Sequence, residues 1–205
     1  SWIDSEDITE DNVAAQLAGC DGIIVPGGFG DRGIEGMITT AKYCREHDIP
    51  YLGICLGMQI AVIEFARHVC GLADANSGEF SKTSAHKIID FLPDQSETID
   101  KGATLRLGAY PCHILPGTRM HECYGCDEIR ERHRHRYEFN NDYRETLTGA
   151  GMTLCGQSPD GHIVEAVELS GHRFFVGVQF HPEFKSRPNR AHPLFKALVE
   201  SSLKK

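Results

Sequence analysis

The sequence predicts an α/β fold: an open, mostly parallel sheet flanked by helices on both faces, with a β-hairpin added. Short apolar runs typical of buried strands alternate with segments whose apolar residues recur at helical spacing. The 205 residues contain no internal repeat, no low-complexity tract and no linker long enough to divide the chain. We therefore expect a single domain spanning residues 1–205.

The first part of the chain predicts two strand–helix units. A buried strand is expected at Cys20–Val25, directly before the turn Pro26-Gly27-Gly28. Apolar residues at helical spacing then predict a helix at Ile34–Glu46. The second unit is a strand at Tyr51–Ile54, which runs without a loop into a helix at Leu56–Val69.

The remainder of the chain predicts shorter elements. The polar segment 76–84 is expected to be a loop, and Pro93–Lys101 to be an exposed loop between strands at 88–89 and 105–107. The sequence Ser158-Pro159-Asp160-Gly161 predicts a hairpin turn. The other expected elements are a helix at Asp142–Ala150, hairpin strands at Met152–Gln157 and Ile163–Leu169, a strand at Phe174–Phe180 and a helix at His192–Leu203.

Charge and composition argue against several classes of partner. Lys and Arg number 21 against 29 Asp and Glu, and this net charge of -8 argues against nucleic acid and against anionic membrane surfaces. The most apolar stretch, Tyr51–Ala66, is too polar to span a membrane. The eight cysteines are spread along the chain, which favours a cytoplasmic protein over a disulfide-rich secreted one. The chain starts without Met or a leader, so we expect a piece of a longer protein.

A candidate nucleophile lies where the second predicted strand meets its helix. The sequence Gly53-Ile54-Cys55-Leu56-Gly57 is the cysteine form of a nucleophile elbow, in which small flanking residues make room for a strained turn. The helix N-terminus after Cys55, and an imidazolium nearby, would favour the thiolate. A buried structural cysteine explains the pentapeptide equally well, so this motif alone leaves both interpretations open.

A candidate base follows the strand predicted at Phe174–Phe180. In an extended backbone His181 and Glu183 point to the same side, so the carboxylate can orient the imidazole while its other nitrogen faces Cys55. The Gly27-Gly28 turn, Cys55 and His181 each come directly after an apolar strand, and such strand ends converge on one crevice in an open α/β sheet. Backbone N–H groups of Gly28 and Leu56 would stabilise an oxyanion there.

At this point the motifs resemble a known family. Residues 25–30 (VPGGFG), 53–59 (GICLGMQ) and 179–183 (QFHPE) resemble the triad-type, or class I, glutamine amidotransferases. Residues 33–40 (GIEGMITT), 76–80 (NSGEF) and 132–138 (RHRHRYE) are similar in particular to the glutaminase domains of the CTP synthase family. The resemblance covers nearly the whole chain. It implies hydrolysis of L-glutamine to glutamate and ammonia through a thioester intermediate.

The resemblance also implies a role for each matching residue. Cys55 would be the nucleophile, His181 the acid and then the base, and Glu183 the residue that orients His181. A free amino acid needs an anion for its ammonium and a cation for its carboxylate, and we assign these to Glu79 and Arg134. The expected glutamine-binding residues are Gly28, Phe29, Leu56, Gly57, Met58, Gln59, Glu79 and Arg134.

Further partners are implied by the family alone. No cofactor is expected in this domain, because ATP, UTP and Mg²⁺ would bind a separate N-terminal synthetase domain that aminates UTP to CTP. The full-length protein would be a homotetramer. The family is activated by GTP, and Arg106 is a candidate contact for that effector. The family's first strand and helix, which precede Trp2, are expected to be absent here.

Several alternatives remain open at this stage. Residues 130–136 hold four arginines and two histidines, which also fit a solvated strand face or, less well, a nucleic-acid contact. Cys123 and Cys126, with His113 and His121 nearby, suggest zinc, but the spacing is not standard, so we expect free thiols and no metal. A peptidase or γ-glutamyl hydrolase on the same scaffold, or a catalytically silent regulatory module, are the competing functions.

Overall fold

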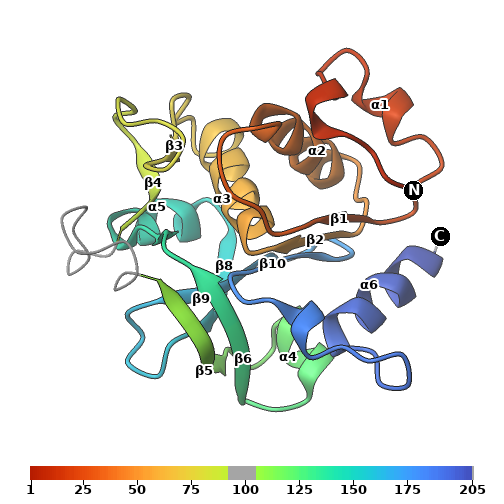
Figure 1. Ribbon diagram of the computed structural model, residues 1–205, viewed down its shortest axis with the longest axis vertical. Helices are drawn as coiled ribbons and strands as arrows, with labels where there is room; N and C mark the ends of the chain where they lie inside the picture. The colour runs from red at the N-terminus through yellow and green to blue at the C-terminus, as the bar shows by residue number, and fades with distance from the viewer. Residues whose placement is uncertain (92–104, 205) are drawn as a thin grey trace.

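A seven-stranded sheet forms the centre of the computed structural model, which describes residues 1–91 and 105–204 (Figure 1). Across the sheet the strands follow the order β1 (Ile23–Val25), β2 (Tyr51–Ile54), β10 (Phe175–Val178), β9 (Val164–Leu169), β8 (Met152–Gln157), β5 (Arg106–Ile114) and β6 (Glu128–His135). A separate three-stranded sheet contains β3 (Asn76–Ser77), β4 (Lys87–Asp90) and β7 (Glu138–Phe139).

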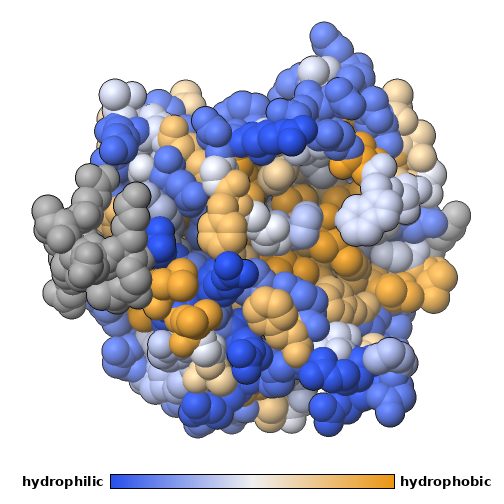
Figure 2. All heavy atoms as spheres, viewed as in Figure 1, coloured by the Kyte–Doolittle hydropathy of each residue, from blue (hydrophilic) through white to orange (hydrophobic). Residues whose placement is uncertain are grey.

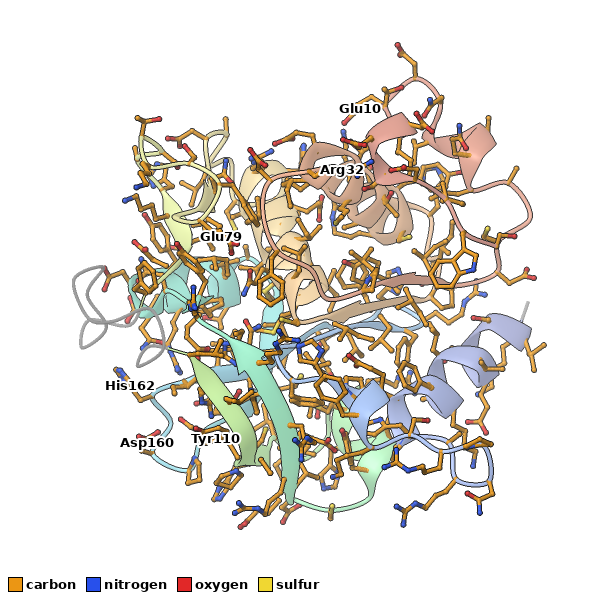
Figure 3. The ribbon with its side chains drawn as sticks, in the orientation of Figure 1. Glu10, Arg32, Glu79, Tyr110, Asp160 and His162 are labelled. Carbon is orange, nitrogen blue, oxygen red and sulfur yellow. The ribbon has the colours of Figure 1, made fainter. Side chains whose placement is uncertain are left out.

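Five of the seven strands in the main sheet run in one direction. β2 pairs parallel with β1 and with β10, while the pairs β10–β9, β9–β8, β8–β5 and β5–β6 are antiparallel. Hence only β9 and β5 are reversed. The expected hairpin is β8–β9, and Asp160 and His162 lie at its tip (Figure 3). The predicted fold class is confirmed.

Helices cover both faces of this sheet. On one face α2 (Ile34–Glu46), α3 (Leu56–His68) and α5 (Arg144–Gly149) share a hydrophobic core with β2, β8, β9 and β10. On the other face α4 (Arg119–Tyr124) and α6 (Pro193–Leu203) form a second core. A short helix α1 (Val13–Gln16) and 3-10 turns at Ser5–Asp7, Asn141–Tyr143 and Pro182–Phe184 complete the described elements. None of the described helices has the length and apolar character that a membrane crossing requires.

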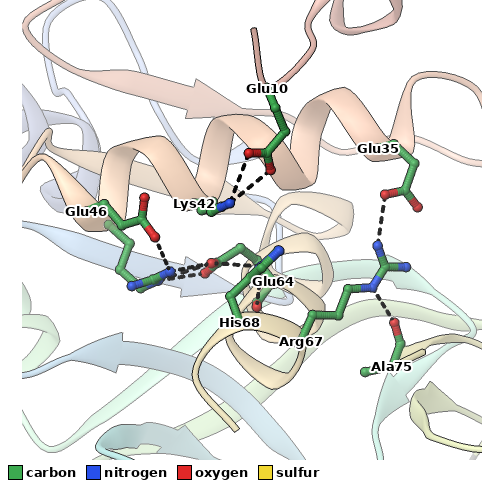
Figure 4. A network of polar contacts seen from close by, with 9 residues as sticks. Glu10, Glu35, Lys42, Glu46, Glu64, Arg67, His68 and Ala75 are labelled. Atoms are coloured by element: carbon green, nitrogen blue, oxygen red, sulfur yellow. Dashed lines mark hydrogen bonds and ion pairs between the residues drawn. The ribbon is translucent and has the colours of Figure 1, made fainter. Parts of the chain in front are cut away.

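An ionic network joins α2 to α3 (Figure 4). The Glu64 side chain on α3 is fully buried and accepts hydrogen bonds from Arg45 of α2, at 3.0 Å from Nε and 2.8 Å from Nη2. Arg67 reaches the other way, from α3 to Glu35 of α2, at 2.8 Å. Because a buried carboxylate is stable only when it is paired, these contacts fix how the two helices lie.

Most apolar elements occur where the sequence predicts them, and several polar ones were missed. α2 and β2 have the predicted bounds, whereas β1 begins at Ile23 and not at Cys20. The sequence predicted neither the length of β5 nor α4. Segment 76–84, expected to be a loop, contributes β3 to the small sheet. The loop expected at Pro93–Lys101 lies outside the described residues.

Candidate active site

Cys55 occupies a strained turn between β2 and α3. Its φ of 52° and ψ of -101° place a non-glycine residue in a conformation that L-amino acids rarely adopt. A Cβ on Gly53 would lie 2.4 Å from the Gly57 carbonyl oxygen, and one on Gly57 would lie 2.1 Å from the Val25 carbonyl oxygen. Only glycine fits at these two positions, as expected for a nucleophile elbow.

The electrostatic environment of Cys55 differs from the expectation. Burial raises the pKa of its thiol to about 12, although the Leu56 backbone N–H acts in the opposite direction; the carboxylates of Glu183, Glu138 and Glu79 raise it further. The helix N-terminus therefore does not hold a free thiolate in this state. Cys55 is thus held as a neutral thiol, which would have to lose its proton to act as a nucleophile.

His181 and Glu183 form the expected pair. The His181 ring contacts Glu183 through Nδ1, at 2.6 Å from Oε1. Burial alone would raise the pKa of Glu183, but this hydrogen bond and the nearby His181 and His192 lower it below its usual value. A carboxylate at Nδ1 makes that nitrogen the donor. His181 Nε2 is buried and has no hydrogen-bond partner among the described residues, so it is the nitrogen available for proton transfer.

Gly27 lies beside both Cys55 and His181. A Cβ built on Gly27 would lie 2.9 Å from His181 Cε1 and 3.5 Å from Cys55 Cβ. One methyl group would thus touch both side chains, although 126 residues of sequence separate them. Gly27 leaves this space open, and the three strand ends converge as the sequence predicted.

A cavity of about 370 Å³ opens in front of Cys55. Six of the predicted site residues line it: Gly28, Phe29, Cys55, Gln59, Glu79 and Arg134. The predicted residues Leu56, Gly57 and Met58 lie in the first turn of α3 instead, where the Met58 side chain belongs to the hydrophobic core. Any contact that these three make with a ligand must therefore come mainly from their backbone.

Side chains of opposite charge line the cavity. Glu79, on the segment between β3 and β4 (Figure 3), accepts a hydrogen bond from the Gly30 N–H at 3.1 Å, which ties it to the loop after β1. Burial raises the pKa of Glu79, while the Gly30 bond and the charge of Arg136 lower it in part. Arg134 lies over the Phe29 ring, with 5.8 Å from its guanidinium carbon to the ring centroid.

Sequence reasoning missed four lining residues: Leu105, His135, Arg136 and Tyr137. Arg136 is the most informative, because its Nε is buried and finds no hydrogen-bond partner among the described residues. The run of arginines and histidines did indicate this region, but the alternation along a strand could not show which arginine reaches the cavity. Gln179 was also missed; its side chain lies 3.6 Å from the Cys55 sulfur and 3.2 Å from Gln59.

Arg106 is not placed as an effector contact would require. Its side chain is only 10% exposed and pairs with Glu165 at 2.6 Å and with Glu138 at 3.7 Å. The guanidinium faces the interior because β5 turns this side chain toward two buried carboxylates. These contacts do not support the assignment of Arg106 to GTP, which stays an untested prediction.

The cysteines and histidines near α4 make other contacts. His121 pairs with Asp127 at 2.8 Å, and the Cys126 thiol lies 3.5 Å from the Glu128 carbonyl oxygen. Within residues 1–91 and 105–204, no group of three or more His, Cys, Asp or Glu side chains is arranged to hold a metal ion. All eight cysteines are free thiols.

Comparisons with known proteins agree with this geometry. The model of the class-I glutamine amidotransferase family matches residues 2–201. The chain is 60% identical over 203 residues to the CTP synthase of Carboxydothermus hydrogenoformans, covering 99% of this chain and 38% of that protein. It is 59% identical over 204 residues to the CTP synthase of Moorella thermoacetica, covering 100% of this chain and 38% of the relative. The chain thus spans somewhat more than a third of the length of these curated relatives.

Solved structures give the same picture. The glutaminase domain of Trypanosoma brucei CTPS with bound acivicin superposes with a TM-score of 0.94 at 41% identity, covering 100% of this chain and 80% of that one. A glutamine amidotransferase of Thermotoga maritima superposes with a TM-score of 0.53 at 16% identity, covering 89% of this chain and 78% of that one. At that identity the likeness shows a shared fold only.

Proposed function

The chain belongs to the class I glutamine amidotransferase family, and on that premise we propose that it hydrolyses L-glutamine through Cys55, His181 and Glu183. The observation that supports this most strongly is the convergence at Gly27. A strained cysteine and a carboxylate-bound histidine both lie beside it, and Cys55 lines a cavity that opposite charges also line. The products are glutamate and ammonia.

The first half of the reaction forms a thioester. As the side-chain amide of glutamine enters, His181 Nε2 takes the Cys55 proton and the sulfur attacks the amide carbon. The oxygen becomes an oxyanion, which the backbone N–H groups of Gly28 and Leu56 stabilise; losing one such donor costs about 3 kcal/mol of transition-state stabilisation. His181 then returns its proton to the leaving nitrogen, the C–N bond breaks and ammonia departs.

The second half hydrolyses this thioester. His181 Nε2 takes a proton from water, and the resulting hydroxide attacks the thioester carbon to form a second oxyanion on the same donors. The C–S bond breaks, the sulfur regains the proton from His181, and glutamate leaves. Glu183 holds the imidazole through Nδ1 and stabilises its positive charge during both halves.

The cavity selects a free amino acid. We assign the α-ammonium to Glu79 and the α-carboxylate to Arg134, with Phe29, Gln59 and the backbone of Leu56, Gly57 and Met58 along the side chain. Arg136 is a second candidate for the carboxylate, since its Nε is buried without a partner among the described residues and its charge acts on Glu79. Comparing Arg134→Met with Arg136→Met separates them, because the clamp residue raises KM for glutamine more than it lowers kcat.

The similarity to CTP synthases extends the proposal to the whole protein. In it, the ammonia aminates UTP to CTP at the expense of ATP, with Mg²⁺, in an N-terminal synthetase domain, and GTP activates the reaction. The complete enzyme is then a cytoplasmic homotetramer. This domain needs no cofactor, nucleic acid or membrane for the chemistry derived above.

Glutamate release from glutamine tests the proposed function. We expect Cys55→Ala to abolish it, while Cys20→Ala, at a partly exposed thiol before β1, retains the wild-type rate. A wild-type protein that hydrolyses γ-glutamyl peptides but not glutamine would favour the competing hydrolase. Turnover that persists in Cys55→Ala would remove Cys55 from the mechanism.

A further inference from the structure

β6 is an edge strand, and its outer edge meets the catalytic residues. It pairs with β5 on one side and with no other strand among the described residues. We use "the free edge of β6" for the outward carbonyl oxygens of Arg130, Arg132 and Arg134. They lie two residues apart, so they point the same way along an antiparallel strand.

Each of these carbonyls contacts a different part of the site. The Arg134 oxygen lies 4.0 Å from the Cys55 sulfur. The Arg132 oxygen accepts the backbone N–H of His181 at 2.8 Å. The Arg130 oxygen accepts a hydrogen bond from Lys185 Nζ at 2.6 Å. One strand edge thus spans the nucleophile, the base and the end of the loop that carries Glu183.

The inward side chains of β6 hold this edge in place through polar contacts. Glu131, His133 and His135 are at most 2% exposed. Glu131 accepts hydrogen bonds from Lys185 at 3.2 Å and from His192 and Tyr124 through the same oxygen, and His133 contacts His135 at 2.9 Å. Hydrogen bonds fix direction as well as distance, so a buried polar row specifies register more tightly than apolar packing does.

We infer that the free edge of β6 aligns His181 with Cys55, and that Lys185 and Glu131 are positioning residues for the proposed glutamine hydrolysis. The inference rests on the proposed function, since it assigns the geometry by which that reaction runs. Lys185 directly follows the 3-10 turn Pro182–Phe184, so its two bonds clamp the His181–Glu183 loop onto β6. Neither residue lines the cavity, so glutamine binding does not depend on them.

Lys185→Met tests the clamp in the complete protein. Methionine keeps most of the length of the side chain but removes both bonds, and a small misplacement of a catalytic group is expected to lower kcat about tenfold, with KM for glutamine unchanged. Lys185→Arg restores a cationic donor and is expected to recover most of kcat. Lys196→Met, at an exposed lysine paired with Glu200 on α6, is the matched control with wild-type kcat.

A double-mutant cycle sharpens the test. Glu131→Gln weakens the same contact from the strand side, so it and Lys185→Met are expected to be non-additive in kcat. Three results would overturn the inference. The first is equal kcat in Lys185→Met and Lys196→Met, and the second is additive effects of Lys185→Met and Glu131→Gln on kcat. The third is a loss of kcat that Lys185→Arg fails to recover. Different results would contradict the proposed function: a wild-type protein that has no glutaminase activity, or a Cys55→Ala variant that keeps it.

Discussion

Two strands of the same sheet, β2 and β6, are built by different forces. All four residues of β2 are buried, and the strand pairs with a parallel neighbour on each side. β6 alternates exposed arginines with buried Glu131, His133 and His135, and it lies at an edge. The centre of the molecule is thus stabilised mainly by apolar burial, while the wall of its cavity depends on buried polar pairs. The difference teaches that the strand held by polar pairs is the one that contributes Arg134 and His135 to the cavity lining.

The surfaces beside the two outermost strands differ in the same way. Beyond β1, Figure 2 shows hydrophobic surface in the hollow between the N-terminal segment and α6, where Ile24 is 46% exposed. Along β6 and the loop before α6 the same view shows mainly hydrophilic side chains. The surface along β6 is therefore more polar than the surface beside β1.

The largest effect is expected where the two parts meet, at His181 and Glu183. Glu183→Gln removes the negative charge that stabilises the imidazolium and leaves the wrong tautomer available. We expect kcat to fall by up to about 10⁴-fold, as when the carboxylate of a catalytic triad is replaced. Steady-state glutaminase assays measure this change. A kcat within a few-fold of wild type would mean that the Glu183 carboxylate neither orients His181 nor stabilises its charge.

The next effect concerns the buried charges behind β6. Arg106→Met leaves Glu165 and Glu138 without their cation, and breaking a buried ion pair in this way costs about 3–5 kcal/mol of the free energy of unfolding. Denaturant titration measures it. Arg119→Met, at an exposed pair with Glu122, is the matched control and is expected to cost no more than about 1 kcal/mol. Equal losses in the two variants would contradict a structural role for the buried pair.

The matching change in the apolar part is Leu52→Ala on β2. Leu52 is fully buried, and its truncation is expected to cost about 2–5 kcal/mol. The two losses differ in their pH dependence, because protonation of the carboxylates relieves the Arg106→Met defect at acid pH, whereas a cavity does not titrate. Unfolding curves at pH 5 and pH 8 distinguish them. A Leu52→Ala loss that shrinks at acid pH as much as the Arg106→Met loss would remove the distinction.

The smallest effect is expected on the slope of the free energy of unfolding against pH. Burial raises the pKa of Glu138 well above its usual value, although Arg106 opposes this, so the folded state keeps the proton to higher pH than the unfolded state does. Titration of Glu138 therefore lowers the free energy of unfolding as pH rises from about 4.5 toward the folded-state pKa. The decrease is at most ~1.4 kcal/mol per pH unit. Glu138→Gln is expected to reduce this slope, with a remainder from Glu165, whose pKa burial also raises. An unchanged slope would show that Glu138 does not titrate in this range.

The contrast between apolar burial and buried polar pairs explains which elements the sequence could predict. β2, α2 and the β8–β9 hairpin follow from apolar periodicity and turn residues, and their predictions are confirmed. β6 has no such apolar periodicity, because three of its four inward residues, Glu131, His133 and His135, are ionisable. Alternating Arg and His therefore fitted a solvated face as well as a cavity wall.

The same reasoning applies to the candidate site. The glycines around Cys55 and the His181–Glu183 spacing have local steric and geometric causes, so short motifs predict them. The pKa of Cys55 and the inward direction of Arg106 depend on residues far away in the sequence, including Glu183, Glu138 and Glu165. No local pattern contains that information, so neither feature could be predicted from the sequence alone.

Covalent labelling by acivicin, the ligand in the Trypanosoma brucei structure, tests the central claim most directly. The chain has eight cysteines, all free, so the position of the label is informative. Peptide mass spectrometry is expected to find one adduct, on Cys55, which excess glutamine prevents and which forms far more slowly in His181→Ala. An adduct on another cysteine, or Cys55 labelling at the same rate without His181, would contradict the account.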